Sequence, residues 1–206
     1  MPTKMSGESA SMHAIQLIEE QLEVLPISIA AILYAADVGK IEASLLSDLL
    51  LRRKPRPPKT GSGGNIVAKE ATPTDPIDFR EASQHLRSHP REKMDYVRVV
   101  INNAILAVGI FMRENDMASM RTPEIQFLGH VVNAIINKGH FKINEGYIPM
   151  ATFDGHVIDS SLNGKPLFDT EKDKGFLEFG DAVALLQWLS RYLRGEKKFV
   201  SGGDAG

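Results

Sequence analysis

Residues 122–141, TPEIQFLGHVVNAIINKGHF, constrain the fold more than any other part of this chain. Thr122 predicts a helix N-cap, Pro123 suits the first helical position, and Glu124 lies where the helix dipole favours negative charge. Gly139 predicts the end of this helix. The expected apolar face between these two signals is Ile125, Leu128, Val131, Val132 and Ile135. The segment therefore predicts a capped helix that stops at a glycine and runs into a strand.

Helical spacing also marks the N-terminal region, residues 1–54. An amphipathic helix is predicted over residues 10–25, with Ser9 or Ser11 as its cap. Pro26 is expected to end this helix and to begin a second one that runs to about Val38 and stops at Gly39. A third helix is predicted over residues 41–53. The predicted inward residues of the first helix are Met12, Ile15, Ile18, Leu22 and Leu25.

The composition changes at residues 55–78, which are rich in Pro, Gly, Ser and Thr. A flexible linker or long exposed loop is predicted there, because the segment cannot bury enough apolar surface to offset its ordering entropy. Residues 79–196 are predicted to form the main helical part, and residues 197–206 a disordered tail. All these parts are expected to belong to one domain.

The main part is predicted to begin with a helix that has Pro90 in its first turn. After Gly139 the apolar period shortens, and Asp154-Gly155 and Asn163-Gly164 indicate turns, so a small β-hairpin or meander is expected. Asp181 is predicted to cap a last helix that ends at Gly195. The expected core residues are Met94, Val97, Ile101, Ala104, Val108 and Met112 in the first of these helices, and Val183, Leu186, Leu189 and Leu193 in the last. The predicted fold class is mainly α with a small C-terminal β-appendage.

Composition limits the classes of function. The 206 residues include no cysteine, which excludes disulfides, thiol catalysis and cysteine-based zinc sites. The net charge of −2 gives no global bias toward nucleic acid. The apolar runs at 25–36 and 97–112 are short or interrupted by Asn102 and Asn103, and the polar N-terminus has no signal core. A cytoplasmic protein without a membrane segment or a cofactor is therefore expected.

Three polar residues are predicted to share one face of the 122–139 helix. His130, Asn133 and Asn137 are spaced i, i+3 and i+7. Two amides and an imidazole offer donors and acceptors for a polar ligand, a base edge or an interface. The alternative is that they pair with backbone or with a partner helix. As a catalytic set they are poor, because an amide does not exchange protons near neutral pH.

The same segment resembles the motif region of HEPN domains, all-α modules of which many are metal-independent ribonucleases. The resemblance implies a helical bundle, a homodimer formed through the 122–139 helix and the helix from Pro90, and a bacterial defence or stress-response setting. Weaker similarity continues through residues 147–181. The matching residues are Pro123, Glu124, Ile125, Gln126, Phe127, Leu128, His130, Val131, Asn133, Ala134 and Phe141.

The departures from this family pattern fall on its reacting positions. The family's arginine position is Val132, and its histidine position is Asn137. An upstream arginine position is Gly129, and Lys138 displaces the motif glycine to Gly139. Because both the phosphate anchor and the proton-transfer group are replaced, the resemblance implies a catalytically inactive relative.

Two other sets of residues have the composition of a site. Arg80 and His85 have the family's arginine-to-histidine spacing, so a ribonuclease using this pair is an alternative function. A metal set of Asp78, His85 and His89 is set aside, because it lies next to the predicted linker without supporting partners. No metal is therefore expected.

A basic run is the remaining candidate, and it gives a hypothesis of RNA binding. Phosphate contacts by five cations would make binding fall with salt at a log–log slope of roughly −3.5. A solvated helix end explains part of the run equally well. Its members are Arg52, Arg53, Lys54, Arg56 and Lys59.

The sequence thus favours a non-enzymatic HEPN-like module of five or six helices that binds a partner protein or RNA. The alternatives are the ribonuclease based on Arg80 and His85, and a nucleotide or small-ligand sensor that uses the His130 stripe. The three hypotheses differ in a simple respect. The first predicts no turnover, the second predicts RNA cleavage, and the third predicts thermal stabilisation by a small ligand.

Overall fold

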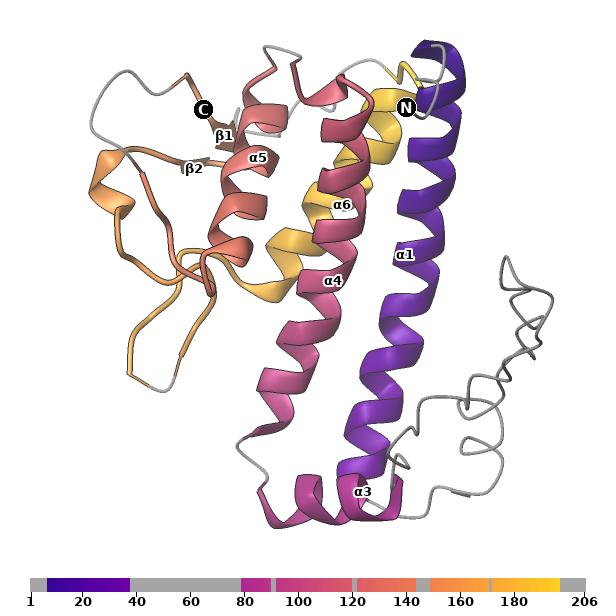
Figure 1. The fold of residues 1–206 in the computed structure, drawn as a ribbon, viewed down its shortest axis with the longest axis vertical. Coiled ribbons are helices and arrows are strands. Elements are labelled where there is room, and N and C mark those ends of the chain that lie inside the picture. Colours follow the sequence, from indigo (N-terminus) through magenta and orange to yellow (C-terminus); the bar gives the residue numbers. More distant parts are fainter. Residues whose placement is uncertain are drawn as a thin grey trace, which may run out of the picture. The chain divides into compact units, whose positions relative to one another are not determined.

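The computed structural model describes residues 7–37, 79–89, 92–119, 122–143, 149–170 and 172–196. Over these residues the protein is mainly helical with one small antiparallel sheet near the C-terminus, which confirms the predicted fold class (Figure 1). The predicted helix at 41–53, the 55–78 segment and the 197–206 tail lie outside the described residues. The helices are α1 (Gly7–Asp37), α3 (Phe79–Ser88), α4 (Lys93–Glu114), α5 (Pro123–Ile136) and α6 (Phe179–Leu193), and the strands are β1 (Thr152–Phe153) and β2 (His156–Val157).

The chain forms two compact units. Unit 1 combines Met1–Ala30 with Met94–Gly206 and contains α5, α6, the β-hairpin, almost all of α4 and most of α1. Unit 2 is Ala31–Lys93 and contains α3 and the C-terminal end of α1.

Helix α1 does not stop at Pro26, so the expected pair of helices is wrong here. It runs continuously from Gly7 to Asp37 with Pro26 inside. A proline within a helix removes one backbone hydrogen bond and crowds the preceding turn, but the helix continues where the flanking turns keep theirs. The inward face also differs from the prediction, because Met12 is exposed. The buried residues of α1 in unit 1 are Ala10, Ala14, Ile18 and Leu25.

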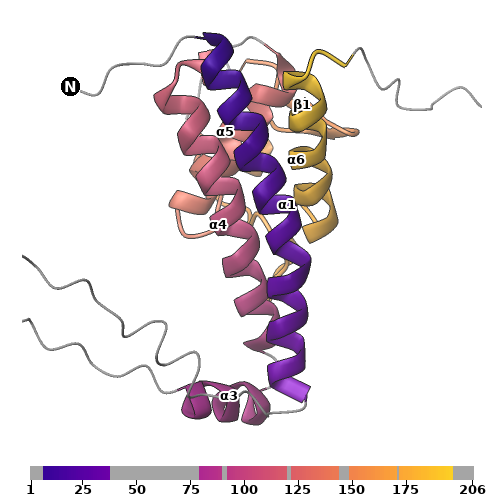
Figure 2. The same ribbon diagram turned by 90° about the vertical axis from the view of Figure 1, so that its right-hand side faces the viewer.

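The helices of unit 1 pack around α4. In Figure 1, α4 lies between α5 and the Gly7–Ala30 part of α1 with α6 behind it, and in Figure 2 this part of α1 lies in front with α4 to its left and α6 to its right. Glu19 of α1 forms an ion pair with Arg194 and accepts a hydrogen bond from Ser190 Oγ of α6 at 3.3 Å. These two contacts join the first and last helices of the unit.

The core stripe of α4 is confirmed except at its start. Met94 is exposed, because it lies in the first turn of a helix that begins at Lys93. The expected start at Pro90 lies outside the described residues. The buried residues of α4 are Val97, Ile101, Ala104, Ile105, Val108, Gly109 and Met112.

Helix α5 begins as predicted but uses its cap residue differently. Thr122 is the N-cap and Pro123 follows it, yet the Thr122 side chain makes no capping bond. Its hydroxyl instead lies 3.0 Å from the Tyr192 hydroxyl of α6. The helix ends at Ile136, three residues before Gly139, and the Gly139 N–H donates to the Ala134 carbonyl at 2.9 Å. The last contact closes the helix end in the manner of a Schellman motif.

The predicted β-appendage is a hairpin with two further bridges. Strands β1 and β2 pair antiparallel, and Asp154-Gly155 forms their turn with positive φ at both residues, as the sequence indicates. Asn163-Gly164 also forms a turn, but it follows a 3₁₀ turn (Ser160–Leu162) and joins no pair of strands. Isolated bridges link His140 with Pro166 and Phe168 with Leu177.

Aromatic rings attach this appendage to the helices. The Phe127 ring of α5 lies 5.8 Å from Phe153 and 6.2 Å from Phe176, and Phe153 meets Trp188 of α6 at 6.5 Å. Buried aromatic pairs stabilise beyond their area alone by about 0.5–1.5 kcal/mol. The hairpin is therefore held on α5 and α6.

Helix α6 starts earlier than the sequence suggests. It begins at Phe179 with Glu178 as N-cap, so Asp181 is its third residue rather than its cap. The Asp181 carboxylate accepts a hydrogen bond from the Glu178 N–H at 2.8 Å, which is the backward half of a capping box. Gly195 has a φ of 73° just after the helix, which confirms the predicted end. Of the four predicted core residues, Leu186 and Leu189 are buried, whereas Val183 and Leu193 are partly exposed.

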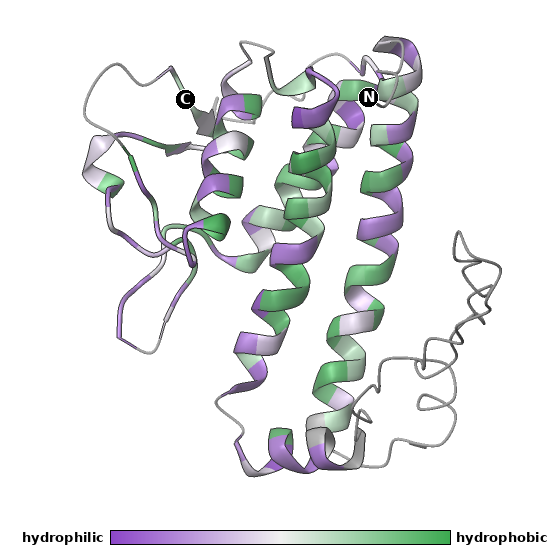
Figure 3. Ribbon diagram, viewed as in Figure 1, coloured by the Kyte–Doolittle hydropathy of each residue, from purple (hydrophilic) through white to green (hydrophobic). Residues whose placement is uncertain are grey.

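Helix α4 is the one described helix long and apolar enough to cross a membrane. Apolar residues recur along its length (Figure 3). The core helix of a soluble protein has the same length and composition, and the buried stripe of α4 in unit 1 fits that role. The absence of a membrane segment stays a prediction.

Candidate functional site

The region where α4 meets α5 carries one of the two positions that the family resemblance marks as reacting. Here α4 contributes Gly109, and α5 contributes Val132, which is buried. A Cβ atom on Gly109 would lie only 2.2 Å from Val132 Cγ2. The two helices therefore approach closely because residue 109 has no side chain.

This contact explains what Val132 does in the fold. A β-branched residue fills the helix crossing with a stiff side chain. An arginine at the same position would bring a charged group into a buried contact without a partner, which costs several kcal/mol. Position 132 is thus a packing position in this chain.

A shallow pocket of about 130 Å³ opens beside the crossing. Its polar lining consists of Arg113, Gln126 and Asn133, and Gly129 forms part of its wall. Sites that enclose a small-molecule ligand have volumes of about 300–1,000 Å³. The pocket is too small to enclose a nucleotide, so it suits the insertion of one side chain better than a sensor site.

The predicted stripe on α5 is only partly available for binding. Asn133 and Asn137 are exposed, and His130 is partly buried. The Asn137 Nδ2 donates to the His140 carbonyl at 3.0 Å, so this amide is used at the end of its own helix. Of the three residues, Asn133 is the one that lines the pocket.

His130 is unsuited to carrying a proton at neutral pH. Burial lowers the pKa of His130 below its ordinary value of 6.5, because desolvation disfavours the imidazolium. Near pH 7 the neutral ring therefore predominates, and it offers one donor and one acceptor.

The sequence analysis missed a second apolar stripe on α4, which we name the α4 seam. Its residues alternate in spacing between three and four, which is the pattern of a coiled-coil interface. At about 100° per residue they lie roughly opposite the buried stripe of the same helix. The signal was present in the sequence, but the core stripe alone was assigned. The α4 seam consists of Tyr96, Val99, Asn103, Leu106 and Ile110, all exposed except Leu106, which is partly buried.

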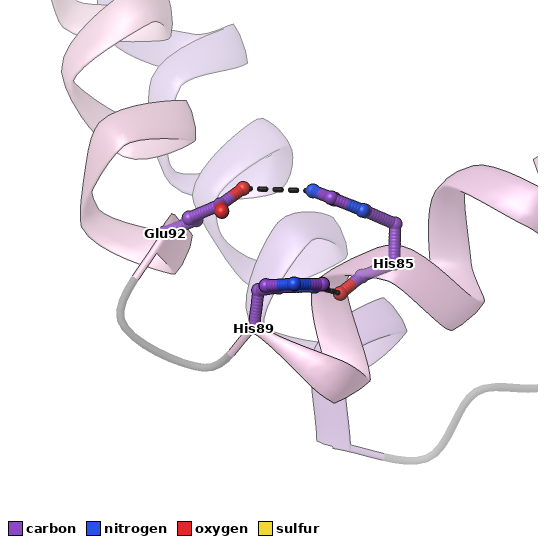
Figure 4. Close-up of side chains that lie close together, drawn as sticks. All are labelled: His85, His89 and Glu92. Atoms are coloured by element: carbon purple, nitrogen blue, oxygen red, sulfur yellow. Dashed lines mark hydrogen bonds and ion pairs between the residues drawn. The ribbon is translucent and has the colours of Figure 1, made fainter.

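The alternative ribonuclease pair lies in unit 2. Arg80 belongs to α3, but its side chain is outside the described part of the protein. His85 lies on the same helix, and its Nε2 is 2.8 Å from Glu92 Oε2 (Figure 4). His89 stacks on His85 with a ring-centroid distance of 4.2 Å. The Arg80 and His85 pair stays a prediction, and Glu92 is a neighbour that the sequence analysis did not assign.

Two other predictions concern residues outside the described ranges. One is Asp78, the third member of the metal set in the sequence analysis. The other is the basic run from Arg52 to Lys59. RNA binding by that run stays a hypothesis.

Comparison with known proteins adds no assignment. No known protein family matches the chain, and neither does any curated protein or solved structure. The HEPN resemblance therefore stays a prediction that depends on the motif residues alone.

Proposed function

We propose that this chain is a non-catalytic binding module whose α4–α5 face docks a partner protein, with a second copy of the chain as the first partner to test. The α4–α5 face is the α4 seam together with Gly129, Asn133 and Ile136 of α5. The observation that carries the proposal is the exposed seam, because its helix already buries a different stripe in the core.

Two apolar stripes on one helix call for two sets of partners. The buried stripe of α4 packs within unit 1, and the seam is left on the surface. Exposed apolar residues gathered on one stripe of a helix are typical of interaction surfaces. Heptad spacing suits another helix, and Asn103 occupies a position where a buried polar residue fixes the register of a helix pair.

The adjoining part of α5 suits the same use. Ile136 is exposed at the end of α5, and Gly129 leaves the pocket wall open beside Asn133. An apolar or amide side chain of a partner would fit a pocket of about 130 Å³. Anchors inserted into such pockets supply most of the binding energy in protein interfaces.

The α5 residues at or near the reacting positions of the family resemblance give little support to catalysis. Val132 is a packing residue, Asn137 is used as a helix cap, and His130 is neutral and partly buried. Attack by an RNA 2′-hydroxyl requires a proton acceptor and also a charge that stabilises phosphate, and none of these three residues supplies that charge. The proposal of a bacterial defence or stress-response setting is supported by the HEPN resemblance only.

Sedimentation equilibrium of the purified chain tests the proposal. Val99 and Val157 are a matched pair, since each side chain is 54% exposed and only Val99 belongs to the seam. We expect a dimer in the wild type, a monomer in Val99→Glu, and an unchanged dimer in Val157→Glu, because a buried unpaired carboxylate disrupts an interface.

The contrary results are equally clear. A wild-type monomer at all concentrations excludes the second copy as partner, and equal effects of both substitutions exclude the seam. RNA as the partner would appear as retention on single-stranded RNA that weakens steeply with salt. Loss of that retention in Val99→Glu, but not in Val157→Glu, would assign RNA to this face instead of a protein.

A further inference from the structure

Unit 2 brings together three side chains with the chemistry of a metal site. One nitrogen from each of His85 and His89 and one carboxylate oxygen of Glu92 all lie within 4.8 Å of one another. Two imidazoles and one carboxylate form a ligand set that Zn²⁺ uses in proteins, with a water in the fourth position. The set shares no residue with the α4–α5 face and does not depend on the proposed function.

The backbone fixes the relative positions of these three residues. The His89 N–H donates to the His85 carbonyl at 2.9 Å, and the Glu92 N–H donates to the His89 carbonyl at 3.0 Å. Residues 85, 89 and 92 thus lie on two consecutive hydrogen-bonded turns at the end of α3. The ligand atoms of the three side chains accordingly lie within 4.8 Å of one another.

A second contact orients one of the rings. His89 Nδ1 lies 3.0 Å from the His85 carbonyl oxygen, and a carbonyl can only accept. Nδ1 is therefore the protonated nitrogen, and Nε2 keeps the lone pair that a metal needs. A bond from the non-ligating nitrogen to a backbone carbonyl is the usual support of a metal-binding histidine.

The distances require only a small adjustment to admit an ion. His85 Nε2 and Glu92 Oε2 are 2.8 Å apart, at hydrogen-bond distance (Figure 4). Two ligand atoms on a tetrahedral Zn²⁺ are separated by about 3.3 Å, given metal–ligand bonds of about 2.0–2.1 Å. All three side chains are at least partly exposed, so rotation of their side-chain torsions can open this gap without disturbing a core.

We propose that His85, His89 and Glu92 form a binding site for a divalent transition-metal ion of the Zn²⁺ class. The ion replaces the proton that joins His85 to Glu92 and fastens the end of α3 to the turn at Glu92. Hard cations such as Mg²⁺ are excluded by chemistry, because they prefer all-oxygen ligand sets. The sequence predicts no metal here, because it offers Asp78 as the third ligand without supporting partners. The structure instead places Glu92 beside the two histidines, and this changes the conclusion.

Equilibrium dialysis of the untagged, full-length chain against Zn²⁺ tests the site. We expect one Zn²⁺ per chain, retained in excess Mg²⁺. His85→Ala, His89→Ala and Glu92→Gln are each expected to weaken binding by about tenfold or more, since each removes a ligand. His13→Ala is the matched control, because His13 is an exposed helical histidine in unit 1.

Histidine NMR provides a readout that needs no variant. Zn²⁺ should shift the ring resonances of His85 and His89 and leave those of His13 and His140 unchanged. The proposal is overturned by the absence of stoichiometric Zn²⁺, by equal loss of binding in His13→Ala, or by Zn²⁺-induced shifts confined to other histidines.

Discussion

Single residues determine how closely α4 and α5 pack, and Gly109 is the clearest case. Gly109→Ala is expected to lower the free energy of unfolding by about 1–3 kcal/mol, because the new methyl group would lie 2.2 Å from Val132 Cγ2 in a buried contact. The higher helix propensity of alanine offsets about 1 kcal/mol at most. Urea unfolding monitored by circular dichroism measures the change.

Gly129 supplies the matched control for this prediction. It also lies inside a helix, but a Cβ there would meet nothing within 4 Å. Gly129→Ala should therefore raise the free energy of unfolding, by up to about 1 kcal/mol. A loss of stability at Gly129, or none at Gly109, would contradict the close approach of the two helices.

The titration of His130 gives a second prediction at the scale of one residue. Burial lowers the pKa of His130 in the folded state, so below its ordinary value of 6.5 the unfolded chain binds more protons than the folded one. The contribution of the neutral His130 ring to the free energy of unfolding is therefore fully present above pH 6.5, and it is lost as the pH falls toward the pKa of the folded state. His130→Gln should thus make stability less dependent on pH between about pH 7 and pH 5.

Urea unfolding at several pH values checks this expectation. His13→Gln, on the exposed face of α1, is the control and should keep the pH dependence of the wild type. Identical pH dependence in His130→Gln and the wild type would show that His130 is not desolvated.

At the scale of elements, the end of α5 carries an unusual residue. Lys138 follows the helix with a φ of 59°, in the left-handed region that costs most residues about 1–2 kcal/mol. Lys138→Gly removes this strain but adds freedom to the unfolded chain. The net expectation is a rise of about 0.5–1 kcal/mol in the free energy of unfolding. Thermal unfolding of both variants measures the change. Lys142→Gly, at an exposed residue without positive φ, should give no gain in stability.

The elements also show what the sequence could and could not predict. The start of α5, the core stripe of α4 and the Asp154-Gly155 turn follow local rules of capping, periodicity and turn chemistry, and the structure confirms them. Ile18 and Leu25 of α1 are buried as predicted, but Met12 is exposed and the helix continues through Pro26, because tertiary packing shifts the buried face toward Ala10 and Ala14.

The candidate site was less predictable than the fold. Spacing predicts that His130 and Asn133 share a face of α5, but which face of α4 remains exposed depends on how α4 packs, and spacing alone does not determine that. Glu92 could not be added to His85 and His89 until the turn after α3 placed it beside them.

For the whole molecule, the central expectation is that it binds without cutting. Total RNA incubated with the purified chain in the presence of EDTA should remain intact, because Val132 is buried against Gly109 and Asn137 caps its own helix. The variants Arg80→Ala and His85→Ala test the rival site in unit 2 and should behave like the wild type. Cleavage by the wild type that both substitutions abolish would make the chain a ribonuclease, whereas cleavage unchanged in both would come from outside this pair. Since neither substitution lies on the α4–α5 face, dimerisation should persist in both variants, and that separates loss of chemistry from loss of the partner surface.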